Sequence, residues 1–174
     1  VVDDSNDSTA KIVSGFLSRG VKLLHPEVRK GRCEARNIGI RAATGDVVVI
    51  LNADVILPID FLDRIKAHYD MGYDSVTVMA EVLNTQTIYA RYIQLQHLKK
   101  VVLGVYERRK YTHDGIYWSE GFSVRKIVAM KTNLFPSGFC VPIEAGEDVN
   151  FADELRALNC KGIVDDSIII HHIA

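Results

Sequence analysis

Acidic residues and a histidine pair follow apolar runs, or begin predicted helices, in four parts of this 174-residue chain. These residues are Asp3, Asp4, Asp54, Glu147, Asp148, His171 and His172. Open α/β sheets bind ligands at the carboxyl ends of their strands, so we expect these side chains to gather at one sheet edge. Carboxylates and imidazoles without paired thiols suit a divalent cation such as Mg²⁺ or Mn²⁺, which commonly neutralises a diphosphate. The residue types therefore predict a metal-assisted site for a phosphorylated ligand.

Each acidic group also has a purely structural explanation. Asn52 and Asp54 end the β-branched run of residues 47–51 and could open a turn before the next proline. Glu147 and Asp148 would stabilise the N-terminus of a helix. Four element ends with the same chemistry nevertheless favour a shared site over four independent caps.

Alternating strand and helix patterns must position these groups. Strands are predicted at residues 46–51, 75–80 and 167–170, with shorter ones at 1–2 and 21–24. Helices are predicted from Ser8 to Gly20, then over 34–43, 84–109 and 148–158. A further helix after Pro58 would bury one face, made of Phe61, Leu62, Ile65 and Tyr69. This rhythm predicts a single α/β domain over residues 1–174, Rossmann-like, with a mostly parallel central sheet flanked by helices.

Composition excludes several classes of protein. The net charge of −1 gives no electrostatic basis for binding nucleic acid. Three cysteines at no metal-ligand spacing favour a reduced, cytoplasmic setting, and no apolar run approaches the ~18 residues of a membrane span. The chain has neither a phosphate loop nor a dinucleotide fingerprint, which argues against an ordinary nucleoside triphosphatase or dehydrogenase. The predicted helix 84–109 is either an ordinary core helix or, through its basic end, a contact with a partner or the inner face of a membrane.

Five segments, in order along the chain, resemble family 2 glycosyltransferases, which have the A-type glycosyltransferase fold. The segments are Val1–Thr9, Gly31–Gly39, Ala43–Asp46, Asn52–Asp54 and Gly146–Asp148. The resemblance covers nearly the whole chain. Its order and spacing are more specific than any single motif.

The resemblance assigns roles position by position. It implies nucleotide contacts for Asp3, Asp4, Arg36 and Asn37, and a catalytic base at Asp148. It implies metal binding at Asp54, with Asn52 at the position where the strict motif has aspartate, and a further ligand at His171 or His172. Adjacent strand residues point to opposite faces, so we expect only one of these histidines to serve. Acceptor contacts would come from Trp118, Glu120, Gly121 and Glu147.

The implied function is inverting transfer of a sugar, assisted by Mg²⁺ or Mn²⁺, from a nucleoside-diphosphate donor to a saccharide or lipid-linked hydroxyl, as in polysaccharide biosynthesis. A uridine-diphosphate sugar is the expected donor. A non-catalytic sugar-nucleotide-binding module and a sugar-phosphate nucleotidyltransferase are the alternatives. The family has a strand and helix before Asp3 that this chain lacks, so we expect a piece of a longer protein, N-terminally truncated. Whether this piece is active, and whether it forms a homo-oligomer, stay open.

Overall fold

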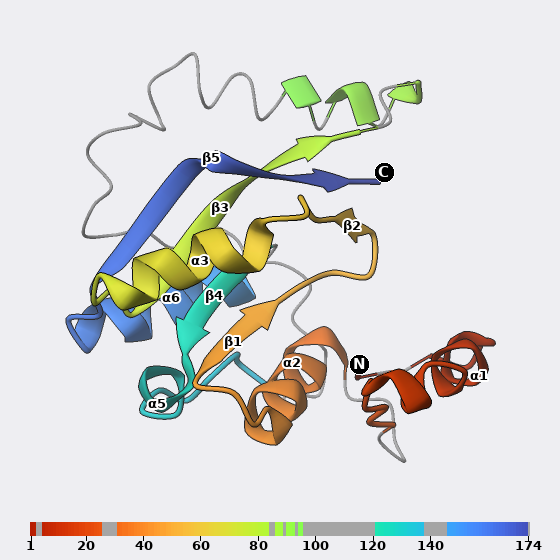
Figure 1. Cartoon of the computed structure of the whole chain (residues 1–174), viewed down its shortest axis with the longest axis horizontal. Helices are drawn as coiled ribbons and strands as arrows, with labels where there is room; N and C mark the ends of the chain where they lie inside the picture. Colours follow the sequence, from red (N-terminus) through yellow and green to blue (C-terminus); the bar gives the residue numbers. More distant parts are fainter. Residues whose placement is uncertain are drawn as a thin grey trace.

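The computed structural model describes residues 1–2, 5–25, 31–83, 86–95 except 89 and 93, 121–137 and 146–173. Helices lie on both faces of one five-stranded sheet (Figure 1). The strands are β1 (Val47–Ile50), β2 (Val55–Ile56), β3 (Ser75–Val82), β4 (Phe122–Arg125) and β5 (Gly162–His172). The helices are α1 (Thr9–Ser14), the 3₁₀ turn η1 (Leu17–Arg19), α2 (Gly31–Ala42), α3 (Phe61–Asp70), α5 (Lys126–Ala129) and α6 (Glu147–Ala157).

The sheet is mixed, which corrects the prediction of a mostly parallel one. The strand order is β1-β4-β3-β5-β2, and only the β3–β5 pair is parallel among the strands described. Strands β1, β3 and β5 do point the same way, because β4 is antiparallel to both β1 and β3. The sequence pattern anticipated the three strands that share a direction and missed β4, which inserts between two of them. Strand β2 was also not expected.

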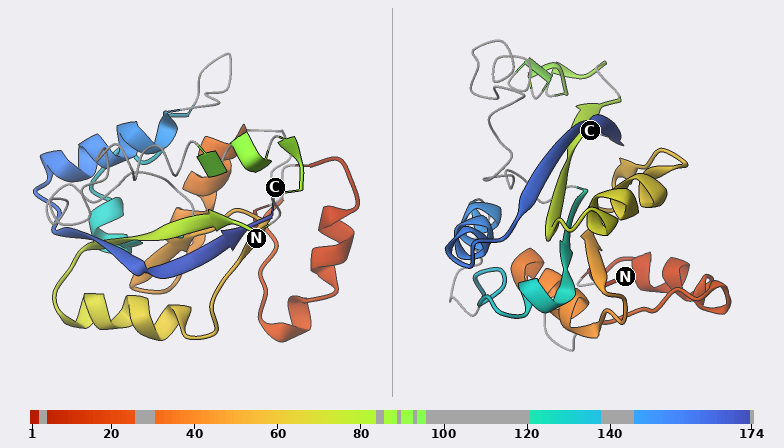
Figure 2. Two further views of the ribbon diagram at one scale, coloured as in Figure 1. Left: turned by 90° about the horizontal axis from the view of Figure 1, so that it is seen from above. Right: turned by 60° about the vertical axis from the view of Figure 1, so that its left-hand side comes forward.

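Two cores fill the two faces of the sheet. On one face α3 packs its buried stripe of Phe61, Ile65 and Tyr69 against β3 and β5. On the other face α2, α5 and α6 cover β1 and β4, and the largest buried side chains there include Phe122, Phe135 and Phe151. Figure 2 shows α3 and α6 on opposite sides of the sheet. Leu62, predicted to share the buried face of α3, is instead 67% exposed, because the i, i+4, i+8 stripe of α3 excludes it.

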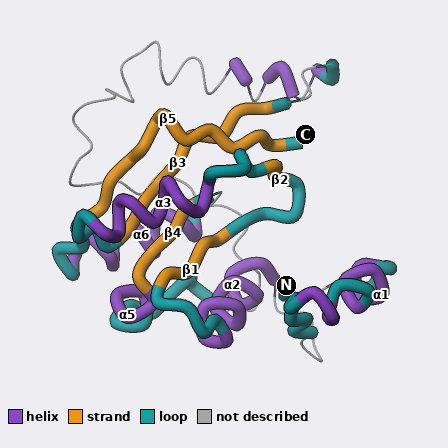
Figure 3. Tube along the Cα trace, viewed as in Figure 1, coloured by secondary structure: helices purple, strands orange, loops and turns teal. Residues whose placement is uncertain are grey.

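The N-terminal part packs loosely against this body. Residues 8–20 were predicted as one helix, but α1 ends at Ser14. The turn η1 follows it and is capped by Gly20, which has a left-handed φ of 84°. Helix α1 has no buried residue and lies apart from the sheet (Figure 3). The strand predicted at 21–24 is reduced to one parallel bridge between Val2 and Leu24. The predicted helix 84–109 lies largely outside the described residues, although residues 88, 90–92 and 94–95 are helical.

Strand directions explain where a site can form. Strands β1, β3 and β5 end at the same edge of the sheet, and antiparallel β4 begins there, since Ile50 pairs with Phe122. The residues that follow β1, the residue that precedes β4 and the histidines that end β5 therefore meet at this edge.

Candidate active site at the carboxyl edge of the sheet

The turn after β1 brings Asp54 to His172. Strand β2, which follows this turn, pairs with the end of β5 so that Val55 lies opposite His172. The amide of Ile173 donates to the Asp54 carbonyl at 2.8 Å, and His172 Nε2 lies 3.0 Å from Asp54 Oδ2. The short strand β2, which the sequence did not reveal, is therefore what joins two residues separated by 118 positions.

The two histidines are not equivalent in this arrangement. His171 pairs with Ile56 in the β2–β5 ladder, and strand alternation directs its side chain to the face opposite that of His172. The contact with Asp54 involves His172.

Asp54 and His172 fit a divalent cation bound together with a diphosphate. Within the described part of the chain, no group of three or more His, Cys, Asp and Glu residues is placed to hold a metal ion. Mg²⁺ in phosphate-transfer sites often uses only one or two protein carboxylates, with phosphate oxygens and water as the remaining ligands. A carboxylate and a neutral imidazole suit Mn²⁺ as well. The pair could therefore hold a cation whose remaining ligands are phosphate oxygens and water.

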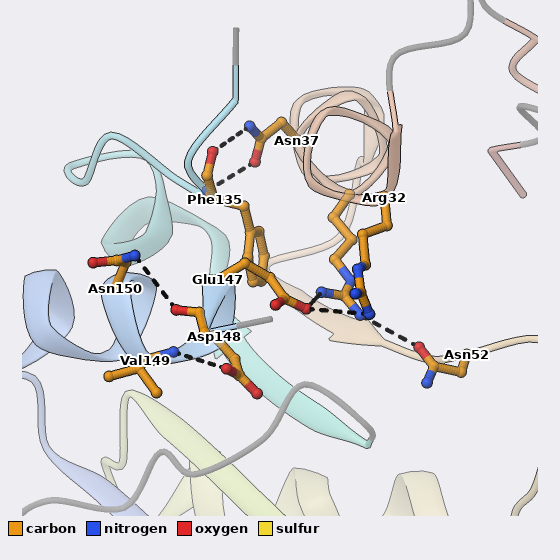
Figure 4. Close-up of polar contacts among 10 residues, drawn as sticks. Arg32, Asn37, Asn52, Phe135, Glu147, Asp148, Val149 and Asn150 are labelled. Carbon is orange, nitrogen blue, oxygen red and sulfur yellow. Dashed lines mark hydrogen bonds and ion pairs between the residues drawn. The ribbon is translucent and has the colours of Figure 1, made fainter. Parts of the chain in front are cut away.

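Arg36 connects three elements at this edge. From α2, its Nη1 donates to Glu147 Oε1 at 2.7 Å, at the start of α6. Its Nη2 reaches Asn52 Oδ1 at 3.5 Å, in the turn after β1. Its guanidinium carbon lies 5.2 Å from the centre of the Phe135 ring. Glu147, Phe135 and Asn52 are labelled in Figure 4.

Glu147 is a buried carboxylate held ionised by arginine. Burial raises its pKa, but the hydrogen bond from Arg36, a backbone hydrogen bond and the charges of Arg32 and Arg36 together bring the pKa below its usual value. Arg32 Nη1 lies 3.8 Å from the same oxygen, Oε1, and its side chain is 49% exposed. Arg32 was not among the predicted site residues. Its spacing of four from Arg36 places both on one helix face and could have identified it.

The side-chain amide of Asn37 forms hydrogen bonds with the backbone of Phe135. Its Nδ2 donates to the Phe135 carbonyl at 2.8 Å, and the Phe135 amide donates back to Asn37 Oδ1 at 2.9 Å (Figure 4). Both residues are 1% exposed. This two-way contact gives the amide a structural role, and Asn37 is not among the residues that line the cavity beside β1.

That cavity has a volume of about 750 Å³ and runs along the outer edge of β1. Val1, Val2 and residues 47–50 are among its lining residues, and Arg32, Arg36 and Asn52 supply polar groups. The volume falls within the ~300–1,000 Å³ typical of ligand pockets. Arg32 and Arg36 of α2 therefore border a space of the size of a ligand pocket.

Asp148 is half-buried in the first turn of α6, beside Glu147. Its Oδ1 accepts a hydrogen bond from the Val149 amide at 2.9 Å (Figure 4). Asp148 directly follows Glu147, the ion-pair partner of Arg36, and therefore lies at the same edge of the sheet as Arg36.

Gly121 precedes β4 and is confined by its neighbours. It has a φ of 68°, and an added Cβ would lie 2.6 Å from Val78 Cγ2 and 2.9 Å from Ile170 Cδ1. Its amide donates to the Ile50 carbonyl at 3.0 Å.

Asp3, Asp4, Trp118 and Glu120 lie outside the described residues. In the described part of the chain, no helix combines the length and hydropathy needed to cross a bilayer.

Solved structures share this arrangement of strands and helices. Staphylococcus aureus TarS, residues 1–349, solved in complex with UDP-GlcNAc, matches all of this chain with a TM-score of 0.73 and 17% identity. The mannosyltransferase PcManGT of Pyrobaculum calidifontis, solved with GDP-Man and Mn²⁺, matches 99% of the chain with a TM-score of 0.67 and 21% identity. The fold is therefore the α/β fold of A-type glycosyltransferases, as the sequence predicted.

The sequence itself shows the family. Residues 1–135 match the model of glycosyl transferase family 2, and the chain belongs to this family. Glycosyltransferase GlyG of Streptococcus pneumoniae serotype 4 is 30% identical over 67 residues. The chain spans 48% of the TarS structure and 46% of the PcManGT structure, and the GlyG match covers 22% of GlyG.

Proposed function

We propose that this chain provides the donor-binding and catalytic core of an inverting glycosyltransferase. The observation that carries the proposal is the meeting of the Asp54–His172 pair, the Arg36–Asn52 contact and the first turn of α6 at one edge of the sheet. Family membership supports sugar transfer as the reaction. The geometry supports a site for a diphosphate leaving group.

The reaction is a single displacement at the anomeric carbon of the donor sugar. Asp148 takes the proton of the acceptor hydroxyl while that oxygen attacks the anomeric carbon and inverts it. The bond between the sugar and the donor's diphosphate breaks at the same time, and the electron pair leaves with the nucleoside diphosphate. Arg36 and Arg32 supply positive charge where the leaving group gains negative charge.

Asp54 and His172 are the residues that would hold Mg²⁺ or Mn²⁺. When bound, the cation would offset the charge that develops on the departing diphosphate. His172 must then present Nε2 as a neutral acceptor, since a protonated imidazole cannot bind a metal. His171, on the opposite face of β5, serves as the natural control.

The donor is proposed to be a uridine-diphosphate sugar. The TarS structure contains UDP-GlcNAc, whereas the PcManGT structure contains GDP-Man, so the two nucleotides must be compared directly. Asp3 and Asp4 are proposed to contact the nucleoside. Trp118, Glu120 and Gly121 are proposed to face a saccharide or lipid-linked acceptor in polysaccharide biosynthesis.

Calorimetric titration with UDP and with GDP, each with and without Mn²⁺, tests the binding part of this proposal. We expect Mn²⁺ to strengthen UDP binding at least tenfold, and Asp54→Ala and His172→Ala to remove that gain. His171→Ala should keep it. Equal loss in both histidine variants, or no Mn²⁺ dependence in the unsubstituted chain, would contradict the proposed site.

Two product assays separate the alternatives. Release of UDP from a UDP-sugar, dependent on Mn²⁺, supports a transferase. Binding without any turnover supports a non-catalytic module. Formation of inorganic diphosphate from a sugar phosphate and a nucleoside triphosphate identifies a nucleotidyltransferase.

A further inference from the structure

We propose that Glu147 is a positioning residue for sugar transfer, and that its carboxylate acts by holding Arg36 between α6 and the turn after β1. The inference rests on the proposed function. It gives Glu147 a different role from the acceptor contact that the family resemblance implies.

The burial of Glu147 supports an internal role. Its side chain is 6% exposed, although it stands at the first position of a surface helix. Its Oε1 is occupied by Arg36 at 2.7 Å and approached by Arg32 at 3.8 Å. A carboxylate so enclosed by its own chain is poorly placed to bind an acceptor sugar directly.

Arg36 is held from three sides. Glu147 and Asn52 each accept a hydrogen bond from one of its N–H groups, and its guanidinium carbon lies over the Phe135 ring. The Phe135 backbone is in turn fixed by the amide of Asn37. The guanidinium is therefore pre-oriented, and its side chain is only 13% exposed.

This geometry links the two halves of the proposed reaction. Asn52 begins the turn that carries the metal carboxylate Asp54, whereas Glu147 immediately precedes the proposed base Asp148. Arg36 spans both. The amide of Asn52 accepts a hydrogen bond from Arg36 without adding a second negative charge to compete with Glu147. Asparagine at position 52, where the strict motif has aspartate, is therefore compatible with the ion pair between Arg36 and Glu147.

Loss of the Glu147 charge should release Arg36 and loosen the first turn of α6. Removing one partner of a buried pair leaves the other charge uncompensated, so the remaining side chain moves or recruits water. We expect Glu147→Gln to lower kcat for sugar transfer 10- to 100-fold, because misplaced catalytic groups lose transition-state stabilisation. KM for the acceptor should change less than about threefold.

A double-mutant cycle with Arg36→Gln is the test, measured as kcat and acceptor KM for transfer from a UDP-sugar. If Glu147 acts through Arg36, Glu147→Gln should cost less than about threefold in the Arg36→Gln background. The conservative variant Glu147→Asp should recover part of the lost turnover. Asp153→Asn is the matched control, since it also replaces an acid of α6 by its amide but breaks only an exposed pair with Arg156.

Independent effects of the two substitutions, or an acceptor KM that rises tenfold with kcat unchanged, would overturn the positioning role. Hydrogen exchange of the amides of residues 147–150 gives a readout that does not need turnover. We expect exchange to accelerate in Glu147→Gln and not in Asp153→Asn, and unchanged exchange would count against the inference. Absence of sugar transfer in the unsubstituted chain would refute the proposed function alone.

Discussion

Replacing Asn37 by alanine should destabilise the fold far more than an average substitution. The change removes both hydrogen bonds between the side-chain amide and the Phe135 backbone, at 2.8 and 2.9 Å. The N–H and C=O of Phe135 then lose their partners in a region where that residue is 1% exposed. Leu134, just before Phe135, has a φ of 64°, which is unfavourable for a residue other than glycine. The two hydrogen bonds between Asn37 and Phe135 help to maintain this conformation.

The expected loss follows from these contacts. Each buried polar group left unpaired costs roughly 1–3 kcal/mol, so two such groups give roughly 2–6 kcal/mol. A typical substitution costs about 1 kcal/mol. Water entering the vacated space would bring the loss toward the lower end.

Equilibrium urea denaturation, followed by circular dichroism, measures this loss directly. Asn150→Ala is the control, because Asn150 is exposed and its amide makes one long hydrogen bond of 3.4 Å to the Gly146 carbonyl. We expect the control to change the free energy of unfolding by less than ~0.5 kcal/mol. A loss below about 1 kcal/mol in Asn37→Ala would refute the reasoning. Full stability with abolished UDP binding would instead favour the nucleotide contact that the family resemblance implies.

Three further predictions follow from the site and the sheet. Gly121→Ala should cost about 2–5 kcal/mol in thermal or chemical unfolding, because the new methyl group overlaps a valine of β3 at a positive φ; a loss below about 1 kcal/mol would contradict this. Asp148→Asn should lower sugar-transfer turnover by roughly 10²–10⁴-fold with unfolding changed by only ~0.3–1 kcal/mol; more than about a tenth of the original turnover would return Asp148 to a structural role. Asp165 should make stability sensitive to acid: burial raises its pKa, but hydrogen bonds from Ser167 and from His68, at 2.7 Å, bring it below the usual value. The stabilisation from Asp165 is therefore complete above the unfolded pKa of ~3.9 and is lost as pH falls through the lower folded pKa. Asp165→Asn should flatten the acid limb of a curve of stability against pH. An unchanged acid limb would count against this prediction.

The sequence alone was sufficient for the family and for the elements that have a strong local pattern. The β-branched run of residues 47–51 and the 3.6-residue period after Pro58 are local signals, so strand β1 and helix α3 were predicted close to their observed bounds. The motifs of family 2 lie in short contiguous segments, which is why the fold could also be predicted. That polar groups would gather where strands end follows from strand direction alone.

Which strands pair, and therefore which side chains meet, depended on the tertiary structure. Strand β4 inserts antiparallel between β1 and β3, and no local pattern encodes a partner that lies more than 40 residues away. The pairing of β2 with β5 brings His172 to Asp54, because side-chain alternation has meaning only once the register is set. The contact between the side-chain amide of Asn37 and the Phe135 backbone joins residues 98 positions apart, so no local pattern could predict it. Local propensity specifies elements, whereas long-range packing and register decide which of their side chains form a site.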